Sequence, residues 1–170
     1  HEAGGHGFGK LGDEYIYHNA FIDACSCTCC GHVFEFNMAK AKGWYDNLSL
    51  TGKMSEVPWS HLIFHEKYSE FVDVFEGGFM HNRGVYRSEQ NSCMNNDIPY
   101  YSTISRESIV KRIKRYAGEE YSFEDFVAND VVEAGSTEIE TKSFDNSYIF
   151  NSSASKQHEP VFMGKLPSLK

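Results

Sequence analysis

Short apolar segments alternate with glycine and polar residues over the first two thirds of the chain. Residues 33–44 carry apolar and helix-forming side chains and predict a helix. Residues 71–76 alternate apolar and polar positions, which predicts a half-buried strand that ends at the glycine pair that follows. A second strand is expected over residues 84–87 and a polar loop over residues 88–97.

From Ser105 onward the apolar positions recur at helical spacing. Ser105 is expected to cap this helix and Gly118 to end it. Its predicted apolar stripe consists of Ile109, Val110, Ile113 and Tyr116. A second capped helix, with two inward-packing phenylalanines, is expected over residues 122–127.

Composition and charge exclude some classes of function. The 170 residues carry 24 acidic and 16 basic side chains, and the resulting net charge of −8 disfavours nucleic acid as a partner. A hydrophobic content of 41% argues against general disorder. No apolar run approaches the roughly 20 residues that cross a bilayer, so no membrane span is expected.

The candidate chemistry lies in residues 1–15, HEAGGHGFGKLGDEY. A hydrolytic zinc ion needs three protein ligands, an open position for water, and a carboxylate that takes the proton of that water. His1 and His6 are the expected ligands, and Glu2 is the expected general base. The pattern predicts a zinc site of the metallopeptidase type.

The spacing of the two histidines departs from the usual HExxH. On an α-helix, positions i and i+5 point about 140° apart, so the two imidazoles could not face one metal ion. A π-bulge with i→i+5 hydrogen bonds would restore a common face, and Gly4-Gly5 supplies the backbone freedom for it.

The third ligand comes from an acidic pair. Gly7, Gly9 and Gly12 allow the chain to turn back and present Asp13 or Glu14. Asp13 is preferred as the ligand. Glu14 is then expected to orient one of the imidazoles without contacting the metal itself.

Four cysteines crowd together in the segment ACSCTCCGH, just before His32: Cys25, Cys27, Cys29 and Cys30. A second zinc site is one interpretation. Structural zinc sites usually use two separated cysteine pairs, however, so a loop with free thiols or strained disulfides is favoured.

Three segments in order, residues 1–15, 77–96 and 105–130, resemble the bacterial IgA metallopeptidase family, in particular its Bacteroidetes-type members. The resemblance covers most of residues 1–130. The HExxGH form also resembles dipeptidyl peptidase III, but the second glutamate motif of that family is not found in this sequence.

The resemblance implies an α+β, metzincin-like zinc endopeptidase domain with a Met-turn at Met94 beneath the metal. It places the zinc ligands at His1, His6 and Asp13 and the base at Glu2. It also implies a secreted, periplasmic or cell-surface protein that acts on protein or peptide substrates.

The domain organisation expected from the sequence has two parts. Residues 1–134 would form the C-terminal part of the catalytic domain, because a ligand stands at the first position and the upstream sheet of such a fold is absent from the sequence given. Residues 135–170, rich in serine, threonine and asparagine, would form a tail or a small β extension.

Two tyrosines near Met94 are candidates for transition-state stabilisation. Tyr86 and Tyr100 could each donate a hydrogen bond to the oxyanion that forms during peptide hydrolysis, or simply pack. Tyr86 is taken as the catalytic candidate. The sequence therefore predicts a zinc endopeptidase, with a zinc-retaining fragment or binding module without turnover as the alternative.

Overall fold

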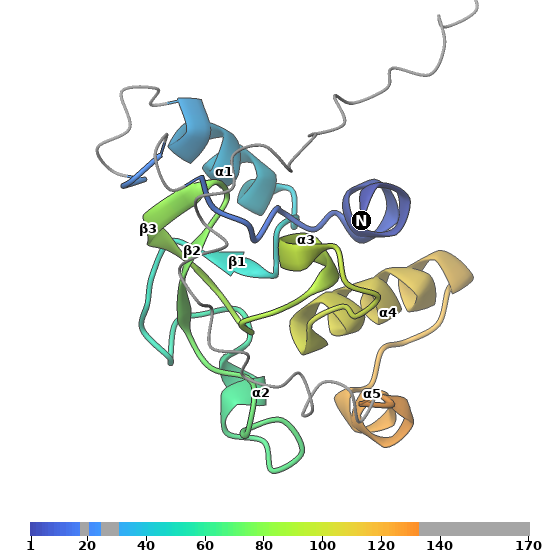
Figure 1. The fold of residues 1–170 in the computed structure, drawn as a ribbon. Coiled ribbons are helices and arrows are strands. Elements are labelled where there is room, and N and C mark those ends of the chain that lie inside the picture. Colours follow the sequence, from blue (N-terminus) through green and yellow to red (C-terminus); the bar gives the residue numbers. More distant parts are fainter. Residues whose placement is uncertain (18–20, 25–30, 133–170) are drawn as a thin grey trace, which may run out of the picture. The chain divides into compact units, whose positions relative to one another are not determined.

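The structure, a computed structural model, describes residues 1–17, 21–24 and 31–132 (Figure 1). All of them belong to one compact unit, His1–Glu133. Its elements in chain order are η1 (Glu2–Gly9), α1 (Gly31–Ala41), β1 (Leu48–Ser49), α2 (Ser60–Ile63), β2 (Phe75–Gly78), β3 (His81–Arg87), α3 (Cys93–Asn96), α4 (Thr103–Ala117) and α5 (Phe123–Asn129). Helices combined with one small sheet confirm the α+β class.

Two predictions concern residues outside those described. The cysteine segment, with Cys25, Cys27, Cys29 and Cys30, is one, and the tail 135–170 is the other. The metal or loop role of the cysteines and the domain boundary after residue 134 therefore stay predictions.

The sheet is antiparallel, with strand order β1-β3-β2. β2 and β3 form a hairpin whose two loop residues, Phe79 and Met80, both have positive φ (47° and 67°). Such backbone matches the twist of a two-residue hairpin, although glycine or asparagine usually occupies these positions. Hydrogen bonds from these residues to the N-terminal segment hold the turn: Phe79 N–H donates to Asp13 O at 2.8 Å and Met80 N–H to Tyr15 O at 2.9 Å.

The predicted strand over residues 71–76 is wrong for most of its length. β2 begins at Phe75 and includes Gly77 and Gly78, which were expected to end it. The register shifts between Glu76 and Gly78, and both glycines have positive φ, so they form a bulge inside the strand. The apolar residues before Phe75 follow a turn into the core, where Val72 is buried.

Two apolar clusters stabilise the unit. The larger joins the α2 region to α4 and α5 and contains Val57, Trp59, Leu62, Ile63, Tyr68, Val72, Ile104 and Phe126. The smaller lies where α1 meets the sheet and contains Ala24, Phe36, Leu48, Phe79 and Val85. Burial of this surface supplies the main free energy that favours folding.

The helical predictions are confirmed in outline. Gly118 ends α4 in the left-handed conformation (φ 73°), and Ser122 caps α5 by accepting from Asp125 N–H at 3.1 Å. The cap of α4 was misplaced, because Ser102 precedes the helix and Ser105 lies buried in its first turn. Instead, the carboxylate of Glu89 accepts from the first helical N–H at 2.6 Å.

The predicted apolar stripe of α4 is also partly wrong. Ile113 is 50% exposed and Tyr116 is 70% exposed, whereas the buried face carries Ile104, Glu107 and Ser108. The predicted polar loop over residues 88–97 contains the short helix α3. Among the described residues, no helix has the length and apolar character needed to span a membrane.

Glu107 is the buried charge of α4, with 1% of its surface exposed. Burial raises the pKa of its carboxyl, but hydrogen bonds from His61 at 2.9 Å, Tyr121 at 2.7 Å and Lys111 at 2.9 Å outweigh burial and lower this pKa from 4.5 to about 2. The charged form is therefore the stable one in the folded state.

We expect Glu107→Gln to remove pH-dependent stability. A lowered pKa favours the folded state above the unfolded value of 4.5, and this contribution is lost as the pH falls toward 2. After allowance for the exposed partners, it should amount to about 2–3 kcal/mol. Urea unfolding from pH 2 to 6 should show the wild-type advantage shrinking with falling pH, while the exposed-pair control Glu119→Gln shows little change. A constant difference across this range would contradict the assignment.

Candidate metal centre

The first element, η1, is a π-helix over Glu2–Gly9. His6 N–H donates to His1 O at 3.2 Å, the i→i+5 bond that defines this helix type, and Gly5 N–H donates to the same oxygen at 2.8 Å. The extra residue between the two histidines is thereby absorbed within one wider turn. The predicted π distortion at Gly4-Gly5 is confirmed.

Close packing beneath η1 requires the glycines. A Cβ on Gly5 would overlap Met94 Sδ, and a Cβ on Gly4 would lie 2.7 Å from Tyr101 Oη. Met94 is fully buried. Its sulfur packs directly against the helix that carries the histidines.

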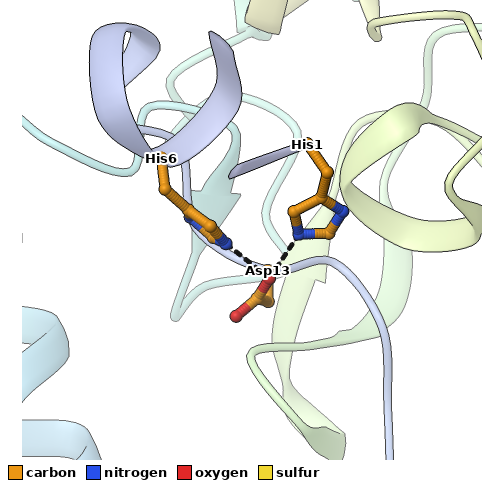
Figure 2. A group of neighbouring side chains, drawn as sticks. All are labelled: His1, His6 and Asp13. Carbon is orange, nitrogen blue, oxygen red and sulfur yellow. Dashed lines mark hydrogen bonds and ion pairs between the residues drawn. The ribbon is translucent and has the colours of Figure 1, made fainter. Parts of the chain in front are cut away.

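The structure brings His1, His6 and Asp13 together (Figure 2). His1 Nε2 lies 3.0 Å and His6 Nε2 lies 2.9 Å from the same oxygen, Asp13 Oδ1. The two ring centroids are 4.9 Å apart. Two imidazoles and a carboxylate thus converge on one point, with candidate ligand atoms all within 4.8 Å of one another.

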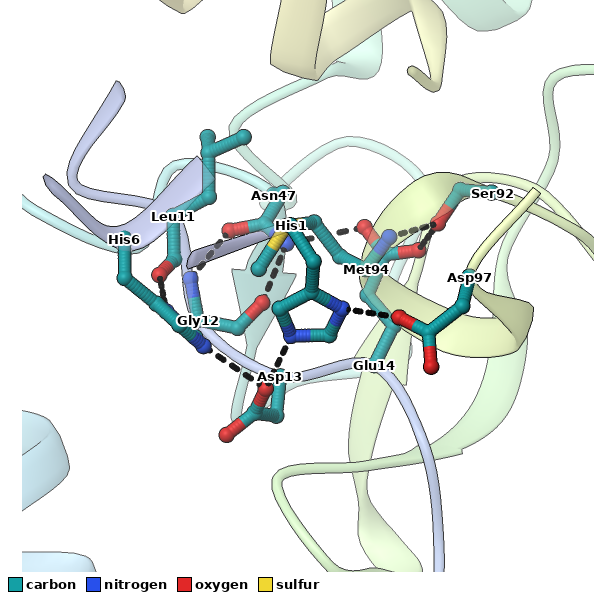
Figure 3. A network of polar contacts seen from close by, with 10 residues as sticks. All are labelled: His1, His6, Leu11, Gly12, Asp13, Glu14, Asn47, Ser92, Met94 and Asp97. Atoms are coloured by element: carbon teal, nitrogen blue, oxygen red, sulfur yellow. Dashed lines mark hydrogen bonds and ion pairs between the residues drawn. The ribbon is translucent and has the colours of Figure 1, made fainter. Parts of the chain in front are cut away.

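Each imidazole is held from behind at Nδ1, as Figure 3 shows. His1 Nδ1 donates to Asp97 Oδ1 at 2.6 Å, and His6 Nδ1 donates to Leu11 O at 2.8 Å. Because both partners are acceptors, Nδ1 carries a proton and Nε2 faces the cluster. The pKa of His6 is raised, chiefly by the bond to Asp13 and against the effect of burial.

The backbone around Asp13 is fixed on both sides. Gly12 N–H donates to Asn47 Oδ1 at 2.9 Å, and Glu14 N–H donates to Met94 O at 2.8 Å. Since successive side chains of an extended segment point to opposite sides, Asp13 faces the cluster and Glu14 faces the interior.

Glu14 is fully buried, and its carboxylate accepts from Asn47 Nδ2 at 2.8 Å and from Ser92 Oγ (Figure 3). Burial raises its pKa to about 7, against the opposing effect of these hydrogen bonds. The prediction that Glu14 orients an imidazole is therefore wrong. Asp97 instead makes the hydrogen bond that orients His1, and sequence reasoning missed this residue.

The remaining predicted site residues are Glu2 and Tyr86. Glu2 is exposed in the first turn of η1, and its charge is the smallest of the effects that raise the pKa of His6. Tyr86 instead lies against Gly52 and interacts with Glu76 across the sheet. The structure thus leaves Tyr86 outside the group formed by the two histidines and Asp13.

Two other tyrosines differ in what their hydroxyl groups contact. Tyr100 Oη donates to Glu89 at 2.7 Å, so it is engaged at the start of α4. Tyr15 was not predicted, yet its hydroxyl interacts with Asp13 and its ring centroid lies 6.4 Å from that of His1. Its position two residues after Asp13 on an extended segment, which puts both on one face, is the signal that could have revealed it.

The donor chemistry of the cluster fits a divalent metal. Two imidazole nitrogens and one carboxylate oxygen leave positions open for water, as catalytic zinc sites do, and the same set also suits iron(II). Binding would displace the Nε2 protons, so metal and protons compete for these nitrogens. The geometry therefore supports a metal site without selecting zinc.

Comparison of the sequence with protein-family models and with curated proteins found no match.

The contact between Gly5 and Met94 generates a stability prediction. Gly5→Ala should lower the free energy of unfolding by about 1–3 kcal/mol, because overlap with the buried sulfur outweighs the gain of about 1 kcal/mol in helix propensity. Urea unfolding of the metal-free protein measures the change.

Two further variants test the mechanism of this loss. Gly31→Ala is the control, because a Cβ there meets no heavy atom within 4 Å. In a double-mutant cycle with Met94→Ala, the combined loss should be smaller than the sum of the single losses. Strict additivity, or a Gly5→Ala protein as stable as Gly31→Ala, would contradict the packing described.

Proposed function

We propose that His1, His6 and Asp13 bind zinc and that the chain acts as a zinc endopeptidase on protein or peptide substrates. The observation that supports this most is the convergence of two Nε2 atoms on Asp13 Oδ1, at 3.0 and 2.9 Å, with both Nδ1 atoms hydrogen-bonded from behind. Histidines that ligate a metal generally have such a partner on their other ring nitrogen.

A zinc ion bound there would lower the pKa of a water molecule and polarise the carbonyl of the scissile bond. Glu2 follows the first ligand directly, and its exposed carboxylate is accessible to water and substrate. In the proposed reaction Glu2 takes a proton from the attacking water and delivers it to the leaving amine. Asp13 balances the positive charge of the site.

For stabilisation of the oxyanion, Tyr15 is better placed than the predicted Tyr86. Tyr15 borders Asp13 and His1, whereas Tyr86 is engaged with Gly52 and Glu76. Burial chiefly, and then the charge of Asp13, raise the pKa of Tyr15, so its hydroxyl stays protonated and able to donate. One such donor is worth about 3 kcal/mol in the transition state.

Membership of the IgA metallopeptidase family and a location outside the cytoplasm are part of the same proposal. They rest on the order of the three motifs, and Met94 packed beneath η1 is compatible with the Met-turn that the family resemblance implies. The alternative, a zinc-binding module without turnover, shares the metal cluster and differs in the absence of hydrolysis.

We expect about one zinc ion per chain and its loss in His6→Ala.

Among the carboxylates, Asp13→Asn should weaken zinc binding by more than about 100-fold, because loss of a ligand has a larger effect than loss of a residue that only hydrogen-bonds a ligand. Glu14→Gln, the matched control, should bind far better, since its amide can still bond Asn47 and Ser92. Elemental analysis and chelator competition measure both effects, and the reverse order would reassign the ligand to Glu14.

Glu2→Gln should separate chemistry from binding. The amide can hydrogen-bond water but cannot accept its proton, so peptide hydrolysis should fall by roughly 10²- to 10⁴-fold while zinc content stays unchanged. Cleavage of a peptide library by the zinc-loaded protein provides the measurement, with Glu35→Gln on the exposed side of α1 as control. Full activity in Glu2→Gln would refute the mechanism, and a zinc-loaded wild type that cleaves nothing would favour the binding module.

A further inference from the structure

The residue that follows α3 has an unusual backbone. Asp97 lies in the left-handed region, with φ 56° and ψ 28°, where side chains other than glycine, asparagine and aspartate are uncommon. Its side chain is 78% exposed, yet it makes a hydrogen bond of 2.6 Å to His1 Nδ1 across 96 residues of sequence. Glycine would meet the backbone requirement of this position better than aspartate does.

The site around α3 explains how this carboxylate reaches His1. Ser92 caps α3 by accepting from Met94 N–H at 3.1 Å and itself donates to the buried carboxylate of Glu14. Met94 packs against Gly5 from the same short helix. α3 is therefore anchored beneath η1, and its left-handed end directs Asp97 toward the outer nitrogen of His1 (Figure 3).

The two histidines differ in what holds them. His6 Nδ1 donates to a neutral backbone carbonyl, whereas His1 Nδ1 donates to a carboxylate. A charged acceptor makes a stronger hydrogen bond and increases the electron density that the imidazole offers at Nε2. The backbone carbonyl of Leu11 is fixed by the chain, but the partner of His1 depends on one side chain.

We propose that Asp97 is a positioning residue for metal binding, which fixes the ring of His1 and strengthens it as a ligand; this inference rests on the proposed zinc site. Asp97 touches neither the metal nor the substrate in this role. Its left-handed backbone is then explained by function, because the position keeps a carboxylate where glycine would be the less strained residue.

The test measures zinc affinity and metal-free stability in the full chain. Asp97→Asn and Asp97→Gly should each raise the zinc Kd by about 10-fold, the low end of the range for such partners because the carboxylate is mostly exposed. Stability of the metal-free protein should stay the same in Asp97→Asn and stay the same or rise in Asp97→Gly. Glu70→Gln, which removes one charge from an exposed position, serves as the charge-matched control.

The outcomes separate this inference from the proposed function. A wild type that binds zinc, with Asp97 variants within about twofold of the Glu70→Gln control, would overturn the role of Asp97 and leave the zinc site standing. Equal loss of zinc affinity and of metal-free stability would show a structural role instead. A wild type that binds no zinc would overturn both proposals.

Discussion

The surroundings of the group formed by His1, His6 and Asp13 depend on the buried carboxylate of Glu14. A carboxylate removed from water is costly unless hydrogen bonds replace its hydration, and those bonds come from Asn47 and from Ser92, which are far away in sequence. Asn47 also bonds both backbone groups of Gly12, at 2.9 and 2.8 Å. One buried group thus fixes the loop after η1, the segment before β1 and the start of α3 relative to one another.

Neighbouring residues of the segment after η1 therefore have different roles. Asp13 presents its carboxylate to the histidines while Glu14 holds the interior, and Tyr15 returns to the side of Asp13. The alternation is that of an extended strand, and the hairpin turn at Phe79 and Met80 secures it through backbone hydrogen bonds. The candidate ligand set is therefore built on a rigid backbone, which favours a fixed geometry for metal binding.

The sequence predicted those features of the structure that depend on neighbouring residues. The histidines with their glycine pair predicted the π-helix, and Gly118 and Ser122 predicted where α4 ends and α5 begins. The sequence also predicted that Asp13, rather than Glu14, would be the carboxylate facing the histidines, and the structure brings Asp13 to them. The family was inferred from resemblance, and the activity from the residues of the first segment together with that resemblance; both stay predictions.

Two of the features that sequence reasoning missed depend on distant partners. Asp97 lies 96 residues from the histidine that it contacts, and Glu89 accepts from the start of α4 across 14 residues. No local pattern marks either residue. The strand expected over residues 71–76 failed for a related reason, since its alternation arises from apolar side chains of a turn that enter the core rather than from strand pairing.

The π-helix has a consequence for insertions and deletions between His1 and His6. The two imidazoles must point to the same side of the helix. The number of residues between them that meets this requirement depends on the type of helix. Loss of one residue from the Gly4-Gly5 pair could be matched by a change to an α-helical turn, with the histidines at i and i+4 still on one face. A spacing of three residues after the glutamate on a π-helix and a spacing of two on an α-helix thus both place the histidines on one face. A change in the number of residues between these candidate ligands need not destroy the site.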